Sequence, residues 1–146
     1  MIKEKQLHIM VCCIGSGKST LAKSMINDTT VYISQDEQGK KSHFSNFMEV
    51  LELGYDCIVD RMNFNKEQRE RYIKPARERG YAINIFEFKT CPVVCFERCM
   101  KKENHPNIKA NDKKTINRVI KFYNDNYEQV TSEEFDNYNL IEEFYE

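Results

Sequence analysis

No apolar run in this 146-residue sequence approaches the roughly 20 residues that a membrane-spanning helix needs. The first residues, M-I-K-E-K-Q-L-H-I-M-V, lead straight into a strand pattern and carry no secretory signal. We therefore expect a cytoplasmic protein without membrane contact, or a nuclear or viral-factory one in a eukaryotic or viral setting, and not a secreted one. No internal repeat or low-complexity linker divides the chain, so its length predicts a single domain over residues 1–146.

The six cysteines include no C-x-x-C pair, which zinc sites and redox motifs commonly use. Three of them stand in apolar, strand-like runs, where a free cysteine behaves as a small hydrophobic residue. The other three, Cys91, Cys95 and Cys99, recur every four residues. That spacing favours one face of a helix over a metal site, and we expect all six thiols to be reduced.

The net charge is only −1, but charges of one sign are concentrated in particular segments. Residues 61–79 contain seven lysines and arginines, and residues 98–121 contain eight. The last 16 residues, 131–146, carry six acidic side chains and no basic one. A basic middle with an acidic tail is compatible with a polyanionic substrate.

The apolar pattern alternates between strands and helices along the chain. Strands are expected at 7–13, 31–34, 57–60 and 81–88, and helices at 18–27, 42–53, 65–79, 92–102 and 112–129. Strands separated by helices pair in parallel, so we expect an α/β fold with a central parallel sheet of about four to five strands flanked by helices. Ligands of such sheets bind beyond the carboxyl ends of the strands, where 14–18, 34–38 and the Asp60-Arg61 turn emerge.

The segment G-S-G-K-S-T at residues 15–20 follows a strand and opens a helix, as a P-loop phosphate-binding site does. Its glycines let main-chain N–H groups point at a phosphate, and the helix N-terminus adds its dipole. The motif predicts contacts with the nucleotide from Gly15, Ser16, Gly17, Lys18, Ser19 and Thr20. Lys18 is expected to reach the β- and γ-phosphates, and Ser19 to place its hydroxyl on Mg²⁺. The alternative is a glycine-rich turn before an ordinary helix.

The P-loop pattern G-x-x-x-x-G-K-[ST] requires a glycine at residue 12, where this sequence has Cys12. A phosphate cup needs unusual backbone conformations mostly at residues 15–17. We therefore expect Cys12 to end the strand with a negative φ, and the loop to work without the missing glycine.

A P-loop alone does not separate kinases from other nucleotide hydrolases. The segment I-S-Q-D-E ends a short strand with Asp36, at the edge of the sheet where chemistry is expected. A carboxylate there can take the proton from a hydroxyl acceptor, which favours a kinase. The alternative for Asp36 is a solvated turn residue or a helix cap.

Four segments together resemble the kinase module of polynucleotide 5′-hydroxyl kinases of the phage and RNA-repair type. They are G-S-G-K-S-T at 15–20, I-S-Q-D at 33–36, V-D-R-M-N-F-N-K-E-Q-R at 59–69 and E-R-C-M-K-K-E-N-H-P at 97–106. The pattern D-x-x-N-x-x-x-x-x-R, from Asp60 to Arg69, is the most specific of these features. The resemblance extends over most of residues 7–125 and implies a P-loop kinase fold.

The resemblance implies transfer of the γ-phosphate of ATP or GTP, with Mg²⁺, to the 5′-hydroxyl end of DNA or RNA. It makes Asp36 the general base and places Asp60 and Arg61 at the acceptor. It also makes residues 92–110 a lid, from which Arg98 and Lys102 neutralise the phosphates, Arg98 as a catalytic residue.

Other functions stay open. A P-loop kinase of a small hydroxyl compound, such as a nucleoside, shares these motifs, and so does a non-catalytic nucleotide-binding module. No D-x-D-G-T phosphatase motif is present, so a separate ligase or 3′-phosphatase would complete the repair of nucleic acid ends. His105 in N-H-P-N-I leaves the choice between ATP and GTP undecided. The aromatic side chains of the acidic tail are expected to pack as a terminal helix.

Overall fold

The structure is a computed structural model that describes residues 4–34, 38–101 and 112–143. Three residues that the sequence singles out, Asp36, Lys102 and His105, lie outside the described residues. In the described ranges, no helix is long and apolar enough to cross a membrane.

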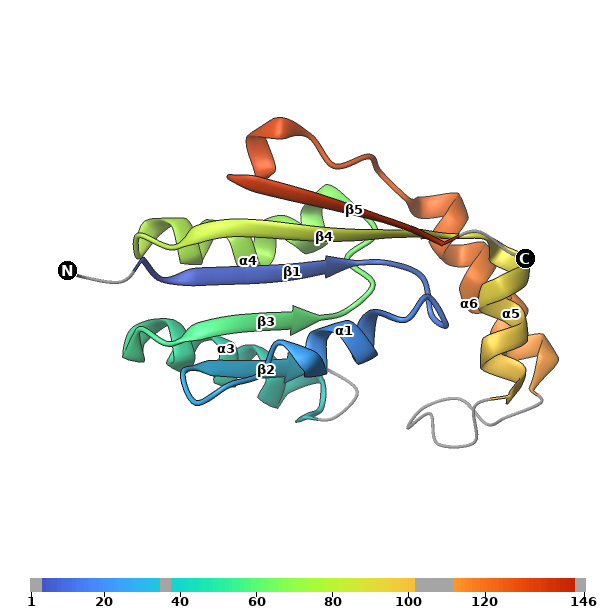
Figure 1. Ribbon diagram of the computed structural model, residues 1–146, viewed down its shortest axis with the longest axis horizontal. Helices are drawn as coiled ribbons and strands as arrows, with labels where there is room; N and C mark the ends of the chain where they lie inside the picture. Colours follow the sequence, from blue (N-terminus) through green and yellow to red (C-terminus); the bar gives the residue numbers. More distant parts are fainter. Residues whose placement is uncertain (1–3, 35–37, 102–111, 144–146) are drawn as a thin grey trace.

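Five strands form one sheet in the order β2-β3-β1-β4-β5 (Figure 1). Every neighbouring pair in this sheet is parallel. The strands are β1 (Gln6–Val11), β2 (Thr30–Ser34), β3 (Asp56–Asp60), β4 (Ala82–Thr90) and β5 (Asn137–Glu143). The expected α/β fold with a parallel sheet is therefore confirmed.

Helices cover both faces of the sheet and also its carboxyl edge (Figure 1). The short helix α1 (Lys18–Ser24) packs on one face, and α3 (Lys40–Leu53) and α4 (Lys66–Glu78) pack on the other. Beyond the carboxyl ends of the strands, α5 (Pro92–Lys101) packs against α6 (Lys113–Asn126). This arrangement surrounds the loop that follows β1, which lies at the same edge.

Two helix starts follow from local sequence. Asn65 caps α4, because its side chain accepts a hydrogen bond from the main-chain N–H of Gln68 at 2.9 Å. Asp112 caps α6 in the same way through Thr115, at 3.2 Å. Both residues were expected as caps, since a carboxylate or amide oxygen can satisfy an N–H group that the first helical turn leaves without a partner.

The core lies in three clusters of buried side chains. The largest packs α3 and α4 against one face of β1, β3 and β4. A second, which includes Met10, Cys12 and Ala22, packs α1 against the opposite face. The third joins α5 and α6 to the loop after β1 through Cys13, Ile14 and their neighbours. The loop is thus held from two sides.

The expectation of a terminal helix in the acidic tail is wrong. After a short 3-10 turn, η1 (Ser132–Glu134), the chain forms β5 and pairs in parallel with β4. Without β5, β4 would be an edge strand with a row of unpaired main-chain groups. Asp136 begins the pairing: its N–H donates to the carbonyl oxygen of Ile83 at 2.8 Å, and its carboxylate accepts from the N–H of Ile83 at 2.7 Å.

Candidate functional site

The loop between β1 and α1 has the backbone of a phosphate cup. Gly15 and Gly17 have φ values of 73° and 93°, which glycine adopts without steric cost. Ser16 is buried between them, and its Oγ donates to the carbonyl oxygen of Cys13 at 2.6 Å. Successive N–H groups in such a loop form a concave site that suits an anion, so the main chain present here fits a nucleotide phosphate.

The side chains that would complete this cup are described only in part. Thr20 is exposed in the first turn of α1. The side chains of Lys18 and Ser19 lie outside what the structure describes. Their expected contacts with the phosphates and with Mg²⁺ therefore stay predictions.

Cys12 does not distort the loop. Its side chain is fully buried, and its main-chain N–H donates to the carbonyl oxygen of Met62 at 3.0 Å. In the described part of the chain, Asn63 is the non-glycine residue with a positive φ, at 48°. The φ of Cys12 is therefore not positive, as expected from the sequence, and a side chain is accommodated there.

Helix α5 lies directly against the loop. A β-carbon added to Gly15 would stand 2.5 Å from the carbonyl oxygen of Cys95 and 3.0 Å from the Sγ of Cys99. From the same helix, the exposed Arg98 donates through Nη1 to the carbonyl oxygen of Gly15 at 3.3 Å. The structure thus brings Arg98 to the rim of the loop.

Asp60 lies at the carboxyl end of β3, between the strand that carries the loop and the strand that leads to Asp36. It is buried, and its Oδ2 accepts a hydrogen bond from the hydroxyl of Tyr32. In the sheet, Asp60 is the direct partner of Ser34, the last residue of β2. Ser34, two residues before Asp36 in the sequence, therefore ends β2 beside Asp60.

The side chain of Gln38 is hydrogen-bonded to the main chain of β2. Its Oε1 accepts from the main-chain N–H of Ser34 at 3.2 Å, and its Nε2 donates to the carbonyl oxygen of Tyr32 at 2.9 Å. Gln38, the first described residue after Ser34, is thereby fixed beside the last residues of β2.

Arg69, at the end of the D-x-x-N-x-x-x-x-x-R pattern, is bound to other protein groups in the interior. Its guanidinium is fully buried and forms an ion pair with Glu134 at 2.6 Å. It also donates to the carbonyl oxygens of Asn63 and Glu128 at 3.0 and 2.9 Å. Arg69 therefore ties the turn after β3 to the segment before β5.

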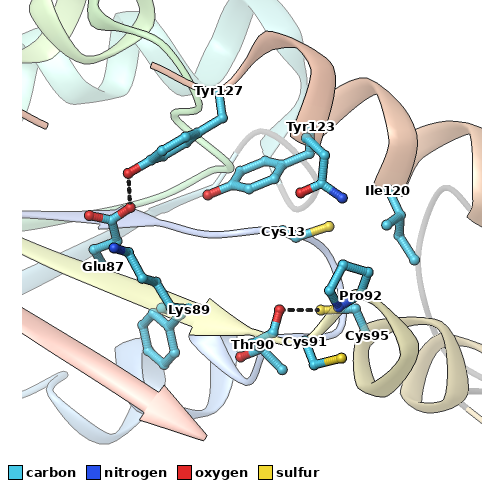
Figure 2. Close-up of a pocket in the computed structure, with 12 residues that line it drawn as sticks. Cys13, Glu87, Lys89, Thr90, Cys91, Pro92, Cys95, Ile120, Tyr123 and Tyr127 are labelled. Atoms are coloured by element: carbon cyan, nitrogen blue, oxygen red, sulfur yellow. Dashed lines mark hydrogen bonds between the residues drawn. The ribbon is translucent and has the colours of Figure 1, made fainter. Parts of the chain in front are cut away.

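A pocket of about 350 Å³ lies between the end of β4, the start of α5 and α6 (Figure 2). The buried carboxylate of Glu87 in its wall accepts hydrogen bonds from the hydroxyls of Tyr127 and Tyr138. Burial, and then the hydrogen bond to Glu87, raise the pKa of both tyrosines, so they remain protonated donors. Burial also raises the pKa of Tyr123, which faces the same pocket.

This pocket is unsuited to a triphosphate. It shares Cys13 and Cys95 with the surroundings of the loop, but its described lining includes no residue of the segment 15–20. A buried carboxylate repels an anion in a medium of low dielectric constant. The phosphates are therefore expected at the loop and not in this pocket. Nothing in the sequence pattern pointed to Glu87, because its partners come from distant segments.

Two of the three cysteines spaced four residues apart share one face of helix α5. Cys95 and Cys99 lie on the buried face of α5, whereas Cys91 precedes the helix and is exposed. All six cysteines are free thiols, and the described residues contain no group of histidine, cysteine, aspartate or glutamate side chains arranged to hold a metal.

Strand order, parallel pairing and the loop after β1 define a P-loop α/β protein with the kinase type of fold. The sequence matches the family model described as an AAA domain over residues 7–130, and the chain belongs to that family. No curated protein matches the sequence.

Several solved structures have the same fold. A putative kinase from Chloroflexus aurantiacus is 12% identical, with 96% of this chain and 89% of that one covered and a TM-score of 0.71. Kti12 from Chaetomium thermophilum, in complex with ADP-AlF3, is 13% identical, with 93% and 88% covered and a TM-score of 0.67.

The APS kinase CysC from Mycobacterium tuberculosis, in complex with AMPPNP and APS, is a third such structure. It is 15% identical, with 95% of this chain and 90% of that one covered and a TM-score of 0.58. Identities this low show the fold alone, and the matched structures differ in what they act on. The fold therefore does not identify the acceptor.

Proposed function

We propose that this protein is a Mg²⁺-dependent kinase that transfers the γ-phosphate of ATP or GTP to the 5′-hydroxyl end of DNA or RNA. The main supporting observation is that three parts of the expected machinery share one edge of the sheet. The phosphate cup follows β1 and has Arg98 of α5 at its rim, Asp60 ends β3, and Ser34, two residues before Asp36 in the sequence, ends β2 beside Asp60.

In the proposed reaction, main-chain N–H groups of the loop and the Lys18 side chain hold the β- and γ-phosphates. Arg98 offsets negative charge as it moves toward the leaving oxygen. The 5′-oxygen forms a bond to the γ-phosphorus, the bond to the β,γ-bridging oxygen breaks, and the hydroxyl proton passes to Asp36. Bound Mg²⁺, with Ser19 as a ligand, would supply further charge compensation between the phosphates.

Asp60 has a separate role in this proposal. The hydrogen bond from Tyr32 fixes the carboxylate of Asp60 at the end of β3, between β1, which leads to the phosphate loop, and β2, which leads to Asp36. We assign to Asp60 the orientation of the acceptor end and leave the proton transfer to Asp36, the residue that the family resemblance makes the general base. A separate ligase or 3′-phosphatase would act on the product.

A kinase of a small hydroxyl compound is the second candidate. Proteins described as a sugar kinase and an APS kinase have the same fold, with TM-scores of 0.63 and 0.58. Salt separates the two candidates, because affinity for a polyanionic acceptor falls steeply as ionic strength rises. Affinity for a neutral acceptor does not.

The direct test is transfer of labelled phosphate from ATP and from GTP to single-stranded DNA and RNA with a 5′-hydroxyl. The same strands with a 5′-phosphate serve as the control. We expect transfer to at least one 5′-hydroxyl strand, and loss of that transfer in Asp36→Asn with nucleotide binding retained. Absence of transfer to either nucleic acid with either donor would overturn the proposal. Tight nucleotide binding without transfer to nucleosides or sugars would then favour a non-catalytic module.

A further inference from the structure

Arg61 and Arg71, near the carboxyl edge of the sheet, differ from Arg69 and Arg79 in the ion pairs that the described residues form. Arg69 and Arg79 each form an ion pair with a glutamate at 2.6 Å. Within the described part of the chain, no acidic side chain forms an ion pair with Arg61 or Arg71. Arg61 is half-buried, and a partly desolvated cation is stabilised by an anion that comes close to it.

Arg61 is held in place by a hydrogen-bonded chain. Its Nη1 lies 2.7 Å from the hydroxyl oxygen of Tyr72. That hydroxyl lies 2.9 Å from Nε2 of His43, whose Nδ1 lies 3.2 Å from the carbonyl oxygen of Gly39. Tyr72 and His43 are both fully buried.

The direction of this chain follows from the groups at its ends. An arginine only donates and a carbonyl oxygen only accepts. Arg61 therefore donates to Tyr72, Tyr72 donates to Nε2 of His43, and Nδ1 of His43 donates to Gly39.

Arg71 packs on an aromatic cluster formed by Phe44 and Tyr72. Its guanidinium carbon is 4.2 Å from the ring centre of Phe44 and 6.0 Å from that of Tyr72. The rings of Phe44 and Tyr72 are in turn 6.1 Å apart. Stacking on aromatic rings leaves the N–H groups at the edge of the guanidinium available to an anion.

The cluster is placed beside the predicted acceptor. Arg61 follows Asp60 directly, and Gly39 stands at the start of α3, three residues after Asp36. Tyr72 and Arg71 come from the amino-terminal half of α4, which begins at the same edge of the sheet.

We propose that Arg61 and Arg71 bind phosphate groups of the acceptor strand, and that Tyr72 and His43 are positioning residues that fix the Arg61 guanidinium for this contact. This inference rests on the proposed kinase function. It makes the acceptor a phosphate-bearing nucleotide or strand, and a free nucleoside a poor substrate. A phosphodiester suits two guanidinium groups because each can offer paired N–H donors to phosphate oxygens.

The first experiment compares acceptors that differ only in phosphate content: a nucleoside, its 3′-monophosphate and a short 5′-hydroxyl oligonucleotide. Arg61→Gln and Arg71→Gln are each expected to raise the KM for the oligonucleotide about 10- to 100-fold, the effect of losing a charged hydrogen bond. The KM for the nucleotide donor should not change. Arg77→Gln, an exposed arginine near the other end of α4, is the matched control and should leave both values unchanged.

The second experiment separates positioning from folding. Tyr72→Phe leaves Nε2 of His43 buried without a donor, so it is expected to lower both thermal stability and acceptor affinity. The double variant Tyr72→Phe with His43→Leu removes both polar partners and is expected to regain stability. Its acceptor KM should stay raised, because Arg61 is still not held. His43→Gln, which keeps an acceptor for Tyr72, should retain more acceptor affinity than His43→Leu.

The outcomes distinguish this inference from the function on which it rests. If no acceptor is phosphorylated by the wild-type protein, the proposed function fails. If strands are phosphorylated but a nucleoside serves equally well, or the two arginine variants match Arg77→Gln, the inference alone is overturned. If the double variant regains both stability and the wild-type KM for the acceptor, Tyr72 and His43 stabilise the fold and do not position Arg61.

Discussion

Gly15 and Cys95 approach each other so closely that a β-carbon on Gly15 would lie 2.5 Å from the carbonyl oxygen of Cys95. This contact joins the phosphate loop to α5, and the hydrogen bond from Arg98 to the Gly15 carbonyl oxygen lies beside it. The loop and the helix that carries Arg98 are therefore packed as one unit, so a change at the loop also displaces Arg98.

Gly15→Ala should impair nucleotide binding more than a positive φ alone can explain. Residue 15 needs both a φ of 73° and space that a methyl group would fill. Gly80→Ala is the matched control, since Gly80 has a φ of 79° with nothing within 4 Å of an added β-carbon. We expect Gly80→Ala to cost about 1–2 kcal/mol of unfolding free energy without affecting nucleotide binding.

For Gly15→Ala we expect a further loss of about 1–3 kcal/mol from overpacking, and at least about a tenfold weaker affinity for ADP. Urea unfolding and nucleotide titration measure the two effects. Equal behaviour of the two variants would contradict the close approach of α5.

Cys12→Gly should not improve the P-loop, although it restores the glycine of the motif. Cys12 is fully buried, and its backbone does not need a positive φ. The substitution removes a packed side chain and adds flexibility to the unfolded chain, at a cost of about 1–2 kcal/mol.

Cys12→Ala keeps the β-carbon and should cost less. Thermal unfolding ranks the two variants, and nucleotide titration should give unchanged affinities for both. Tighter nucleotide binding by Cys12→Gly would show that the loop is constrained by its cysteine.

Arg69→Met and Arg79→Met should differ strongly in stability. Each arginine forms an ion pair at 2.6 Å, but the Arg69 pair is buried whereas the Arg79 pair is exposed. Removing Arg69 leaves the buried carboxylate of Glu134 without its cation, which costs about 3–5 kcal/mol. Loss of the exposed pair costs about 0–1 kcal/mol.

Denaturant unfolding of both variants checks this difference. Arg69→Met with Glu134→Gln should recover part of the loss, since no charge then remains buried alone. Similar midpoints for the two single variants would argue against a structural role of Arg69.

Stability should fall on acidification, in part because of His8. Burial lowers the pKa of His8 below its usual value of 6.5 and outweighs the opposite effect of Asp56. Below pH 6.5 the unfolded chain therefore binds a proton that the folded protein resists, so the free energy of unfolding decreases as the pH drops.

His8→Gln should flatten this dependence between pH 7 and pH 5, measured by urea unfolding at each pH. The flattening should be partial, because other groups that bind protons on acidification keep their contributions. An unchanged slope in His8→Gln would contradict the burial of the neutral ring.

Local sequence was enough to predict strands β1 to β4, the helices between and after them, and the loop after β1. The caps Asn65 and Asp112 act within three residues of their own positions, so their role could be seen without tertiary structure. The φ of Cys12 was also predictable, because a strand end imposes it. The edge position of Asp60 followed from the rule that parallel strands carry ligands at their carboxyl ends.

The errors concern segments whose conformation depends on distant partners. The aromatic tail was expected to be a helix, but residues Asn137–Glu143, which include Tyr138, pair with the open edge of β4 as a strand. Tyr138 then meets Glu87, 51 residues earlier, which no spacing in the sequence could reveal. Arg69 was part of a functional pattern, yet its partner Glu134 lies 65 residues away and makes it structural.

The sequence by itself determined the α/β class, the P-loop and the edge of the sheet where the chemistry is expected. These features depend on residues close in the chain and on the alternation of strands and helices. Only the tertiary structure decided which cations are paired and which are not, because ion pairing depends on side chains brought together by folding. That distinction assigns Arg69 to the core, whereas Arg61 and Arg71 form no ion pair with a described acidic side chain, which is why we propose them as contacts of the acceptor.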